Sequence, residues 1–265
     1  MHPPDNDIRP DGLGAMERWL YRHADRIIVL LPHADAYIEP LGGGSGKIVW
    51  IPNGVDLGSF PQPQEPPPNS SFSLMYFGAH GQANRLDILL HAMSLLRNRK
   101  LPQPINLRMI GDGPLKPDLV QLRERLGLAD LVSFEDAVPK KRIPALSAAA
   151  DAFVLCVDDL PGLYRYGISM NKLYDYLAGS RPIVIASGAS NNPVAEAGAG
   201  VTVDPANPAA LADGIAAVMS MPPEQRRRMG EAGRAYVEAN HGFDRLGARL
   251  AATLDQVVKE RRNTT

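Results

Sequence analysis

The stretch Gly167-Ile-Ser-Met-Asn-Lys-Leu-Tyr-Asp175, continued by Tyr-Leu-Ala-Gly-Ser-Arg-Pro-Ile-Val184, carries the clearest structural signal in the chain. Ile168, Leu173 and Leu177 are apolar at roughly helical spacing, and the run that follows Pro182 is short and apolar. These patterns predict a loop, then a helix, then a buried strand.

Polar residues cluster where the helix of this stretch begins. A helix N-terminus offers unpaired N–H groups and a partial positive charge, which favour an anion such as phosphate. Lys172, next to Asn171, adds a full positive charge, and Asp175 can accept hydrogen bonds from two neighbouring hydroxyl groups. Because a phosphate next to a diol is the signature of a nucleotide, we predict a nucleotide site here.

The same alternation of strand and helix continues on both sides of this stretch. It predicts an α/β fold, a doubly wound parallel sheet, whose ligands bind beyond the carboxyl ends of the strands. We expect strands at 72–77, 105–110, 132–134, 152–157, 182–186 and 200–203. Helices are expected at 82–98, 115–126, 140–149, 169–179, 193–197, 208–219, 223–239 and 244–262.

The loops that follow these strands are therefore the places to look for function. Gly78 and Gly81 follow the first strand and allow close approach of the backbone to a ligand, so this loop is a second candidate anion site, although a tight turn without a ligand is an alternative. In the same loop, His80 is expected to touch the ligand or to cap the turn.

Two further loops give weaker signals. Gly111-Asp-Gly-Pro114 is explained equally well by turn chemistry and by ligand contact. The backbone amides of Ala137 and Val138 are a candidate for reading the edge of a base, with a plain turn as the favoured interpretation. Asp158 and Asp159 are interpreted as a solvated loop.

The first part of the chain looks incomplete as a domain. A helix at 11–23, a fully buried strand at 26–31, a helix at 32–41 and a strand at 47–51 are expected there. Because buried parallel strands need neighbours on both sides, residues 1–60 are interpreted as the remnant of a larger domain. Residues 61–71 form a proline-rich linker, and residues 72–242 form the ligand-binding domain.

Composition excludes several classes of function. The formal net charge is −1, so nucleic acid is not expected as a partner. The single cysteine, Cys156, lies in an apolar run and is expected to be a buried hydrophobe. Neither a secretory signal nor an apolar run of spanning length is found, so a cytoplasmic location is expected, with peripheral contact at the inner face of the membrane left open through Arg226-Arg-Arg228.

Taken together, these motifs resemble the family four, retaining, nucleotide-sugar glycosyltransferases of the GT-B fold. The segments that carry the resemblance are Ala24-Asp-Arg-Ile-Ile-Val-Leu30, Ile51-Pro-Asn-Gly-Val-Asp56, Gly111-Asp-Gly-Pro114 and Ala148-Ala-Ala-Asp151. The resemblance implies that residues 1–60 belong to the acceptor-side domain and that residues 243–265 form a helix that packs back towards it. It implies a nucleotide-sugar donor as substrate, no cofactor and no metal.

The resemblance also assigns individual residues. It places Ser169 and the backbone amides of Met170, Asn171 and Lys172 near the donor phosphates, and Asp175 at the ribose. The remaining donor-contacting residues are expected to be Gly78, His80, Gly81, Asn84, Gly111, Ala137 and Val138.

The sequence departs from the family pattern in an informative way. The first of two family carboxylates falls on Gly167, and two cations expected in the first loop fall on Ala79 and Asn84. The Asn-Lys-Leu within the donor motif is similar to the branch that transfers deoxy-amino sugars in O-antigen or capsule assembly, and a UDP-linked donor is expected. We hypothesise that Lys172 replaces the missing cations and, with Asp175, forms the catalytic pair, with help from Arg85 or Arg165.

Several alternatives remain at this stage. The chain is expected to act on a glycan or lipid-linked acceptor only with a partner chain or with the rest of the N-terminal domain. It is otherwise a non-catalytic nucleotide-sugar-binding module or one half of a split transferase. A sugar-nucleotide epimerase is a third possibility, whereas an NAD-dependent enzyme is disfavoured because no Gly-x-Gly-x-x-Gly follows the first strand.

Overall fold

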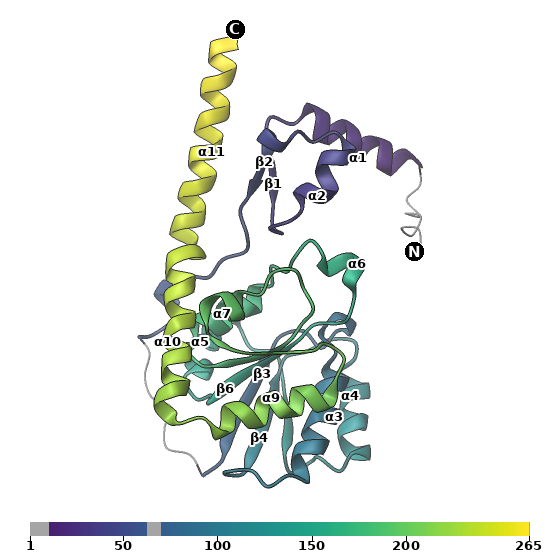
Figure 1. The fold of residues 1–265 in the computed structure, drawn as a ribbon, viewed down its shortest axis with the longest axis vertical. Coiled ribbons are helices and arrows are strands. Elements are labelled where there is room, and N and C mark those ends of the chain that lie inside the picture. Colours follow the sequence, from purple (N-terminus) through teal and green to yellow (C-terminus); the bar gives the residue numbers. More distant parts are fainter. Residues whose placement is uncertain (1–10, 63–69, 265) are drawn as a thin grey trace.

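The computed structural model describes residues 11–62 and 70–264, so the middle of the expected proline-rich linker lies outside the described residues (Figure 1). Within these residues, six parallel strands form one sheet in the order β5-β4-β3-β6-β7-β8. Its strands are β3 (Phe72–Phe77), β4 (Ile105–Ile110), β5 (Val132–Glu135), β6 (Ala152–Cys156), β7 (Ile183–Ala186) and β8 (Gly200–Val203). The prediction of a doubly wound parallel α/β sheet is confirmed.

Helices cover both faces of this sheet, so its central strands are buried on both sides. Alternate residues of β3 point to opposite faces, so Leu74 packs in one core and Met75 in the other. One core receives α3 (Leu86–Arg97), α4 (Lys116–Arg125) and α9 (Pro208–Ser220). The other receives α7 (Asn171–Ala178), α8 (Pro193–Ala197) and α10 (Pro223–Asn240), with α5 (Ile143–Ser147) packed against it.

The order of the strands reverses between β3 and β6. The chain runs outward from β3 to β5, then returns to the centre and runs outward again from β6 to β8. The crevice beyond the carboxyl ends of two such strands is the usual ligand site of an open α/β sheet. The loop after β3 and the loop between β6 and α7 therefore meet at the point where a ligand is expected.

Some expected helices are shorter or interrupted. The helix expected at 82–98 begins as a short 3₁₀ turn, η4 (Gln82–Asn84), and breaks at Arg85, whose φ of 39° is left-handed. The helix expected at 140–149 starts as η5 (Lys140–Arg142) before α5, and the helix expected at 169–179 starts at Asn171. An unexpected short helix, α6 (Pro161–Tyr164), lies between β6 and α7 because Pro161 suits a first helical turn.

The N-terminal segment forms a small separate sheet. Its elements are α1 (Asp11–His23), β1 (Ile27–Val29), α2 (Asp35–Ile38), η1 (Glu39–Leu41), η2 (Ser45–Lys47) and β2 (Ile48–Trp50), and β1 pairs in parallel with β2. The expectation that the first strand is fully buried is wrong, because Ile28 is 44% exposed. Within the described residues the sheet has two strands, so one face of β1 has little to pack against.

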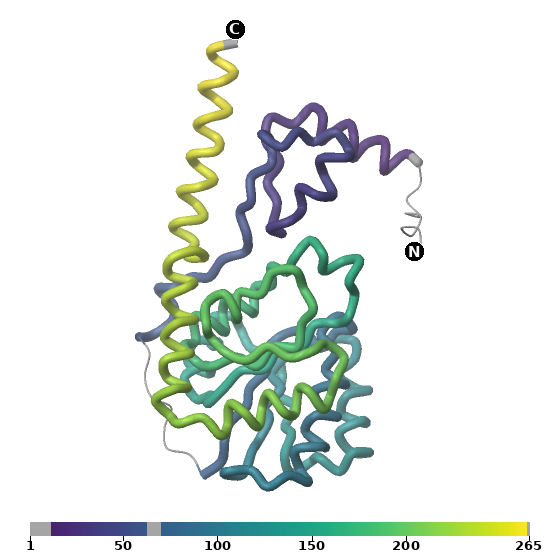
Figure 2. Tube along the Cα trace, viewed as in Figure 1, coloured from purple at the N-terminus to yellow at the C-terminus, as the bar shows by residue number. Residues whose placement is uncertain are grey.

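The N-terminal segment is connected to the larger sheet by the chain itself and by contacts with the C-terminal helices. Residues 51–56 lead into η3 (Leu57–Ser59), and Val55 forms an isolated bridge with Gly242 where α10 gives way to α11 (Phe243–Thr264). Figures 1 and 2 show α11 rising beside β1 and β2. Ion pairs hold it there, from Arg26 to Glu260 at 2.6 Å and from Arg261 to Asp25 at 2.7 Å.

Candidate functional site

The loops after β3 and β4 lie directly on each other at the switch point. A Cβ atom on Gly111 would come within 2.0 Å of the Gly78 carbonyl oxygen, and one on Gly113 within 2.6 Å of the His80 carbonyl oxygen. His80 N–H donates to the Asp112 carbonyl at 2.8 Å. The loop after β3 leaves no room for a side chain at residue 111, which explains the glycine there. The loops after β3 and β4 together form one rigid wall.

Lys172 reaches from the start of α7 to this wall. Its Nζ donates to the Tyr76 hydroxyl at 2.9 Å and to Oδ1 of Asn84, and it lies 4.9 Å from the centroid of the Tyr76 ring. Burial lowers the pKa of Lys172 to about 8. Gly78 provides the necessary room, since a Cβ atom there would lie 3.2 Å from Nζ.

This geometry brings together two positions that the sequence analysis treated separately. Asn84, where the resembling family has a cation, instead accepts a hydrogen bond from the cation of Lys172. The ammonium group of Lys172 therefore lies against the loop after β3, although Lys172 belongs to α7. When an anion binds here, the ammonium group of Lys172 exchanges its neutral hydrogen-bond partners for a charged one.

Asp175 lies one turn further along α7 and is only 7% exposed. Its Oδ1 has no hydrogen-bond partner among the described residues and lies 3.6 Å from Lys140 Nζ. Burial raises the pKa of this carboxyl, and Lys140 partly opposes the rise. A buried carboxylate oxygen without a donor is costly, so a hydroxyl group of a ligand would satisfy it.

The loop after β5 approaches the same carboxylate. Ala137 is exposed and Val138 packs partly against the second core, and both lead into η5 with Lys140. Lys140, at the end of this loop, thus links it to α7 through Asp175, and Ala137 is exposed. Its backbone position agrees with the idea that it faces a base, which stays a prediction.

His80 takes a different place from the one the sequence suggested. It is 0% exposed, and neither ring nitrogen has a hydrogen-bond partner among the described residues. Its ring lies 6.0 Å from that of Tyr76 and 5.7 Å from that of Phe134. Burial, with a smaller effect of Lys116, lowers the pKa of His80. Its neutral ring therefore packs beneath the loop after β3. Gly81, by contrast, has open space where a side chain would be.

The start of α7 is open. Met170 occupies the N-cap position in an extended conformation and makes no side-chain cap, and Asn171 is exposed. Uncapped amides of a first helical turn are available to an anion. Ser169 is engaged elsewhere, because its hydroxyl accepts the Asn53 N–H at 3.0 Å.

Other candidate cations are already neutralised or turned away. Arg85 pairs with Asp158 at 2.7 Å and with Asp87 at 3.1 Å, so the acidic loop residue Asp158 serves as its partner. The Arg165 guanidinium lies 4.6 Å from the Tyr166 ring. Among the three cations considered from sequence, Lys172 is thus the one that faces both the first loop and the start of α7.

Sequence reasoning missed several residues of this region. Tyr76 reads as one more apolar residue of a buried strand, and Lys140 as one of several surface cations. Asn53 belongs to a segment that carries the family resemblance, but nothing local links it or Asn191 to the loop before α7, because their partners are over a hundred and over twenty positions away in the chain. Contacts of this kind become visible only once the chain is folded.

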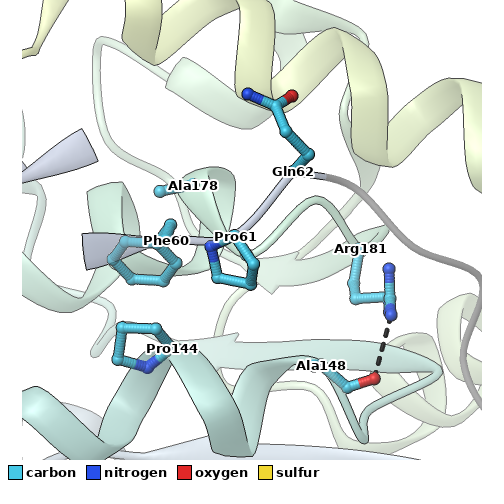
Figure 3. A pocket seen from close by; sticks show the side chains of 8 residues that line it. Phe60, Pro61, Gln62, Pro144, Ala148, Ala178 and Arg181 are labelled. Carbon is cyan, nitrogen blue, oxygen red and sulfur yellow. Dashed lines mark hydrogen bonds between the residues drawn. The ribbon is translucent and has the colours of Figure 1, made fainter. Parts of the chain in front are cut away.

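A small cavity elsewhere does not compete with this site. It measures about 20 Å³ and is lined in part by Phe60, Pro61, Pro144 and Arg181 (Figure 3). Arg181 precedes β7, which places the cavity at the opposite end of the sheet from the switch point. A volume of this size holds about one water molecule, far less than a nucleotide needs.

The fold agrees with what the chain is similar to. The family model described as glycosyl transferases group 1 matches residues 71–221. The GDP-mannose-dependent alpha-(1-6)-phosphatidylinositol monomannoside mannosyltransferase of Mycolicibacterium smegmatis is 30% identical over 169 residues, which cover 63% of this chain and 44% of that protein. The Mycobacterium tuberculosis protein of the same name is 31% identical over 166 residues, 62% of this chain and 42% of its own length. This chain thus matches less than half the length of these relatives.

Solved structures give the same fold at lower identity. Sucrose-phosphate synthase from Thermosynechococcus elongatus superimposes with a TM-score of 0.76 and 20% identity, covering 98% of this chain and 65% of that one. The Anabaena protein HepE, solved in complex with UDP and glucose, gives a TM-score of 0.72 and 17% identity, covering 92% and 66%. Within residues 11–62 and 70–264, no helix is both long enough and apolar enough to cross a membrane.

Proposed function

Because the chain belongs to the glycosyl transferases group 1 family, we propose that it is the donor-binding part of a retaining glycosyltransferase that uses a nucleotide-sugar. The observation that carries the proposal is the pairing of Lys172 and Asp175 one turn apart at the start of α7, at the switch point of the sheet. A cation and a hydroxyl acceptor at this spacing suit a diphosphate next to a ribose.

In the proposed reaction, the nucleoside diphosphate leaves while the acceptor hydroxyl attacks from the same face of the sugar. Lys172 and the open amides of α7 stabilise the charge that develops on the leaving diphosphate. Asp175 holds the ribose hydroxyls and so fixes the diphosphate against these donors. No metal is required in this scheme, and addition of EDTA is expected to leave nucleotide binding unchanged.

The identity of the base separates two candidate donors. The resemblance of the Asn-Lys-Leu motif to transferases of deoxy-amino sugars favours a UDP-linked hexose derivative. The names of the two mannosyltransferase relatives, which are the more similar in sequence, favour GDP-mannose instead. Exposed Ala137 and the backbone around it are the proposed contacts of the base in either case.

The acceptor is proposed to be a glycan or a lipid-linked glycan used in cell-surface polysaccharide synthesis at the cytoplasmic face of the membrane. Residues 11–50 form a two-stranded sheet, whereas an acceptor site needs a complete domain. We therefore propose that transfer requires further N-terminal structure, in the same chain or in a partner. A non-catalytic binding module is the alternative.

A thermal-shift screen of UDP, GDP, ADP and CMP tests the proposal. A ligand at 100 times its Kd stabilises the folded state by ~2.7 kcal/mol, which for a chain of this size raises Tm by roughly 5–10 °C. One nucleoside diphosphate is expected to give this shift, with CMP as the control. If none of the four nucleotides shifts Tm at millimolar concentration, the proposed donor site is wrong.

A further inference from the structure

The loop that precedes α7, which we call the donor loop (residues 166–170), is held by two asparagines from distant parts of the chain. Asn191, in the loop after β7, binds both backbone groups of Ile168: its Oδ1 accepts the Ile168 N–H at 2.6 Å, and its Nδ2 donates to the Ile168 carbonyl at 3.2 Å. A side-chain amide thus replaces the backbone partner that a strand or a helix would provide.

Asn53 makes the equivalent contact with the next residue. Its backbone N–H donates to Ser169 Oγ at 3.0 Å, and its Nδ2 donates to the Ser169 carbonyl at 2.6 Å. Asn53 lies in the passage between the small and the large sheet, close to the bridge of Val55 with Gly242. The two asparagines therefore fix consecutive residues of the donor loop, Ile168 and Ser169, from two different parts of the chain.

Other backbone bonds hold the beginning of the donor loop: the Gly167 N–H donates to the Tyr164 carbonyl at 3.1 Å, and the Tyr166 carbonyl accepts the His33 N–H at 3.2 Å. Gly167 adopts a φ of +103°, and a Cβ atom there would lie 2.6 Å from Cδ of Pro32 and 2.7 Å from Oδ1 of Asn191. Met170 gives α7 no side-chain cap. The direction of the first amides of α7, and of the Lys172 side chain two residues further on, thus depends on the backbone at Ile168 and Ser169.

We propose that Asn191, together with Asn53, is a positioning residue that sets the donor loop so that the α7 amides and Lys172 point at the diphosphate of the donor. The inference rests on the proposed function and deepens it. It assigns phosphate recognition to a residue that itself need not touch the nucleotide. Asn191 and Asn53 also join the donor loop to both sheets, which explains why the loop can keep its shape although its second residue is a glycine.

A positioning role and a merely structural role of Asn191 differ in which ligand loses affinity when the side chain is removed. If Asn191 positions phosphate-binding groups, Asn191→Ala weakens binding of UDP but leaves uridine, which has no phosphate, almost unaffected. If it only supports the fold, both ligands are affected alike or neither is. The GDP and guanosine pair replaces UDP and uridine if GDP is the nucleotide that stabilises the wild-type chain.

The neighbouring residue offers a matched control. Asn192 also binds backbone groups, accepting the N–H groups of Val194 and Ala195 at 3.1 and 3.2 Å, but it caps α8 and does not touch the donor loop. Asn192→Ala removes the same chemical group from the adjacent position. Its effect on Tm is expected to be similar to that of Asn191→Ala, without the loss of phosphate affinity.

The experiment measures Kd for UDP and for uridine with the wild-type chain, Asn191→Ala, Asn191→Asp and Asn192→Ala. Asn191→Ala should raise the Kd of UDP about tenfold or more, the equivalent of about one charge-assisted hydrogen bond, and that of uridine by less than about twofold. Asn191→Asp keeps the acceptor for the Ile168 N–H, so it should fold and give an intermediate loss.

Three results overturn the inference, and they are distinguishable. If wild type binds UDP but Asn191→Ala and Asn191→Asp bind it equally well, the positioning role is wrong and the proposed function stands. If the losses are equal for UDP and uridine, Asn191 has a structural role only. If wild type binds neither UDP nor GDP, the proposed function fails and the inference fails with it.

Discussion

Lys172→Met is expected to weaken nucleotide binding strongly and, at the same time, to stabilise the folded chain. Methionine keeps the length and apolar stem of lysine but removes its charge. Among the described residues, the hydrogen-bond partners of the ammonium group in the free protein are neutral, the Tyr76 hydroxyl and Oδ1 of Asn84, and the group is largely buried. The charge is therefore costly until a diphosphate arrives.

The loss of affinity follows from the charge. At ~4 Å and an effective dielectric constant of about 20, an ammonium and a phosphate oxygen attract each other by about 4 kcal/mol before the cost of desolvation. A hydrogen bond to a charged group has a net value of about 1.5–3 kcal/mol. Lys172→Met should thus raise the Kd of the nucleoside diphosphate about 10- to 150-fold.

The gain in stability follows from the pKa. Burial lowers the pKa of Lys172 from its ordinary value of 10.5 to about 8. At pH 7 this corresponds to roughly 3 kcal/mol of destabilisation of the folded state. Methionine recovers part of that, since it leaves the Asn84 oxygen to water and the Tyr76 hydroxyl still donates to the Ala79 carbonyl at 2.7 Å. We expect a net gain of about 1–2 kcal/mol.

Isothermal titration with UDP or GDP and chemical denaturation at pH 7 measure the two effects in one sample. Lys141→Met is the control, because Lys141 is exposed and its loss changes the net charge equally. It should leave both quantities nearly unchanged. An unchanged nucleotide Kd in Lys172→Met would refute the role of this cation, and a large loss of stability would refute the argument from burial.

Four further predictions concern the same site and its supports. Nucleotide affinity should fall as pH rises above about 8, by up to about tenfold per pH unit, because only protonated Lys172 attracts the diphosphate; a flat profile between pH 7 and 9.5 in titration calorimetry contradicts this. Asp175→Asn should reduce the preference for UDP over 2′-deoxy-UDP by about fivefold, since the amide is a weaker acceptor for ribose hydroxyls; an unchanged preference removes Asp175 from the ribose. Arg181→Met should destabilise the chain by about 2–4 kcal/mol in denaturation experiments without changing nucleotide affinity, because the guanidinium donates to the buried carbonyls of Ala148, Ala150 and Ser180 far from the site. Gly167→Glu should lower Tm by about 5 °C or more, given the left-handed φ and the contact with Pro32, and a normal Tm would show that the donor loop can move away.

The fold was largely predictable because its signals are local. A buried parallel strand is a short apolar run, and each helix between two strands shows its own period, so the six strands of the main sheet were predicted within one or two residues. The partial exposure of β1, the first N-terminal strand, was not predicted, because burial of a strand depends on how many neighbouring strands it has. The break at Arg85 was not predicted either, since a left-handed arginine has no sequence signal, and its pairing with Asp158 joins residues far apart in the chain.

The candidate site was predictable in its parts but not in its arrangement. Lys172 and Asp175 belong to one helix, and their spacing alone places them on neighbouring turns. The residues that complete the arrangement, such as Tyr76, Asn53 and Asn191, come from other elements, and no local pattern links them to the start of α7. His80 shows the opposite case, since a histidine in a glycine loop suggests a ligand contact, whereas the folded chain buries it entirely.

The sequence by itself determined the alternation of strands and helices, the loops where a ligand is expected to bind, and the presence of one cation and one carboxylate at the start of a helix. Hydrophobic periodicity and residue type are properties of short segments, so they are readable without the fold. Only the tertiary structure decided that Lys172 lies against Asn84 and that two asparagines fix the donor loop. These contacts join residues separated by 88, 116 and 23 positions, and their energies depend on which groups become buried together.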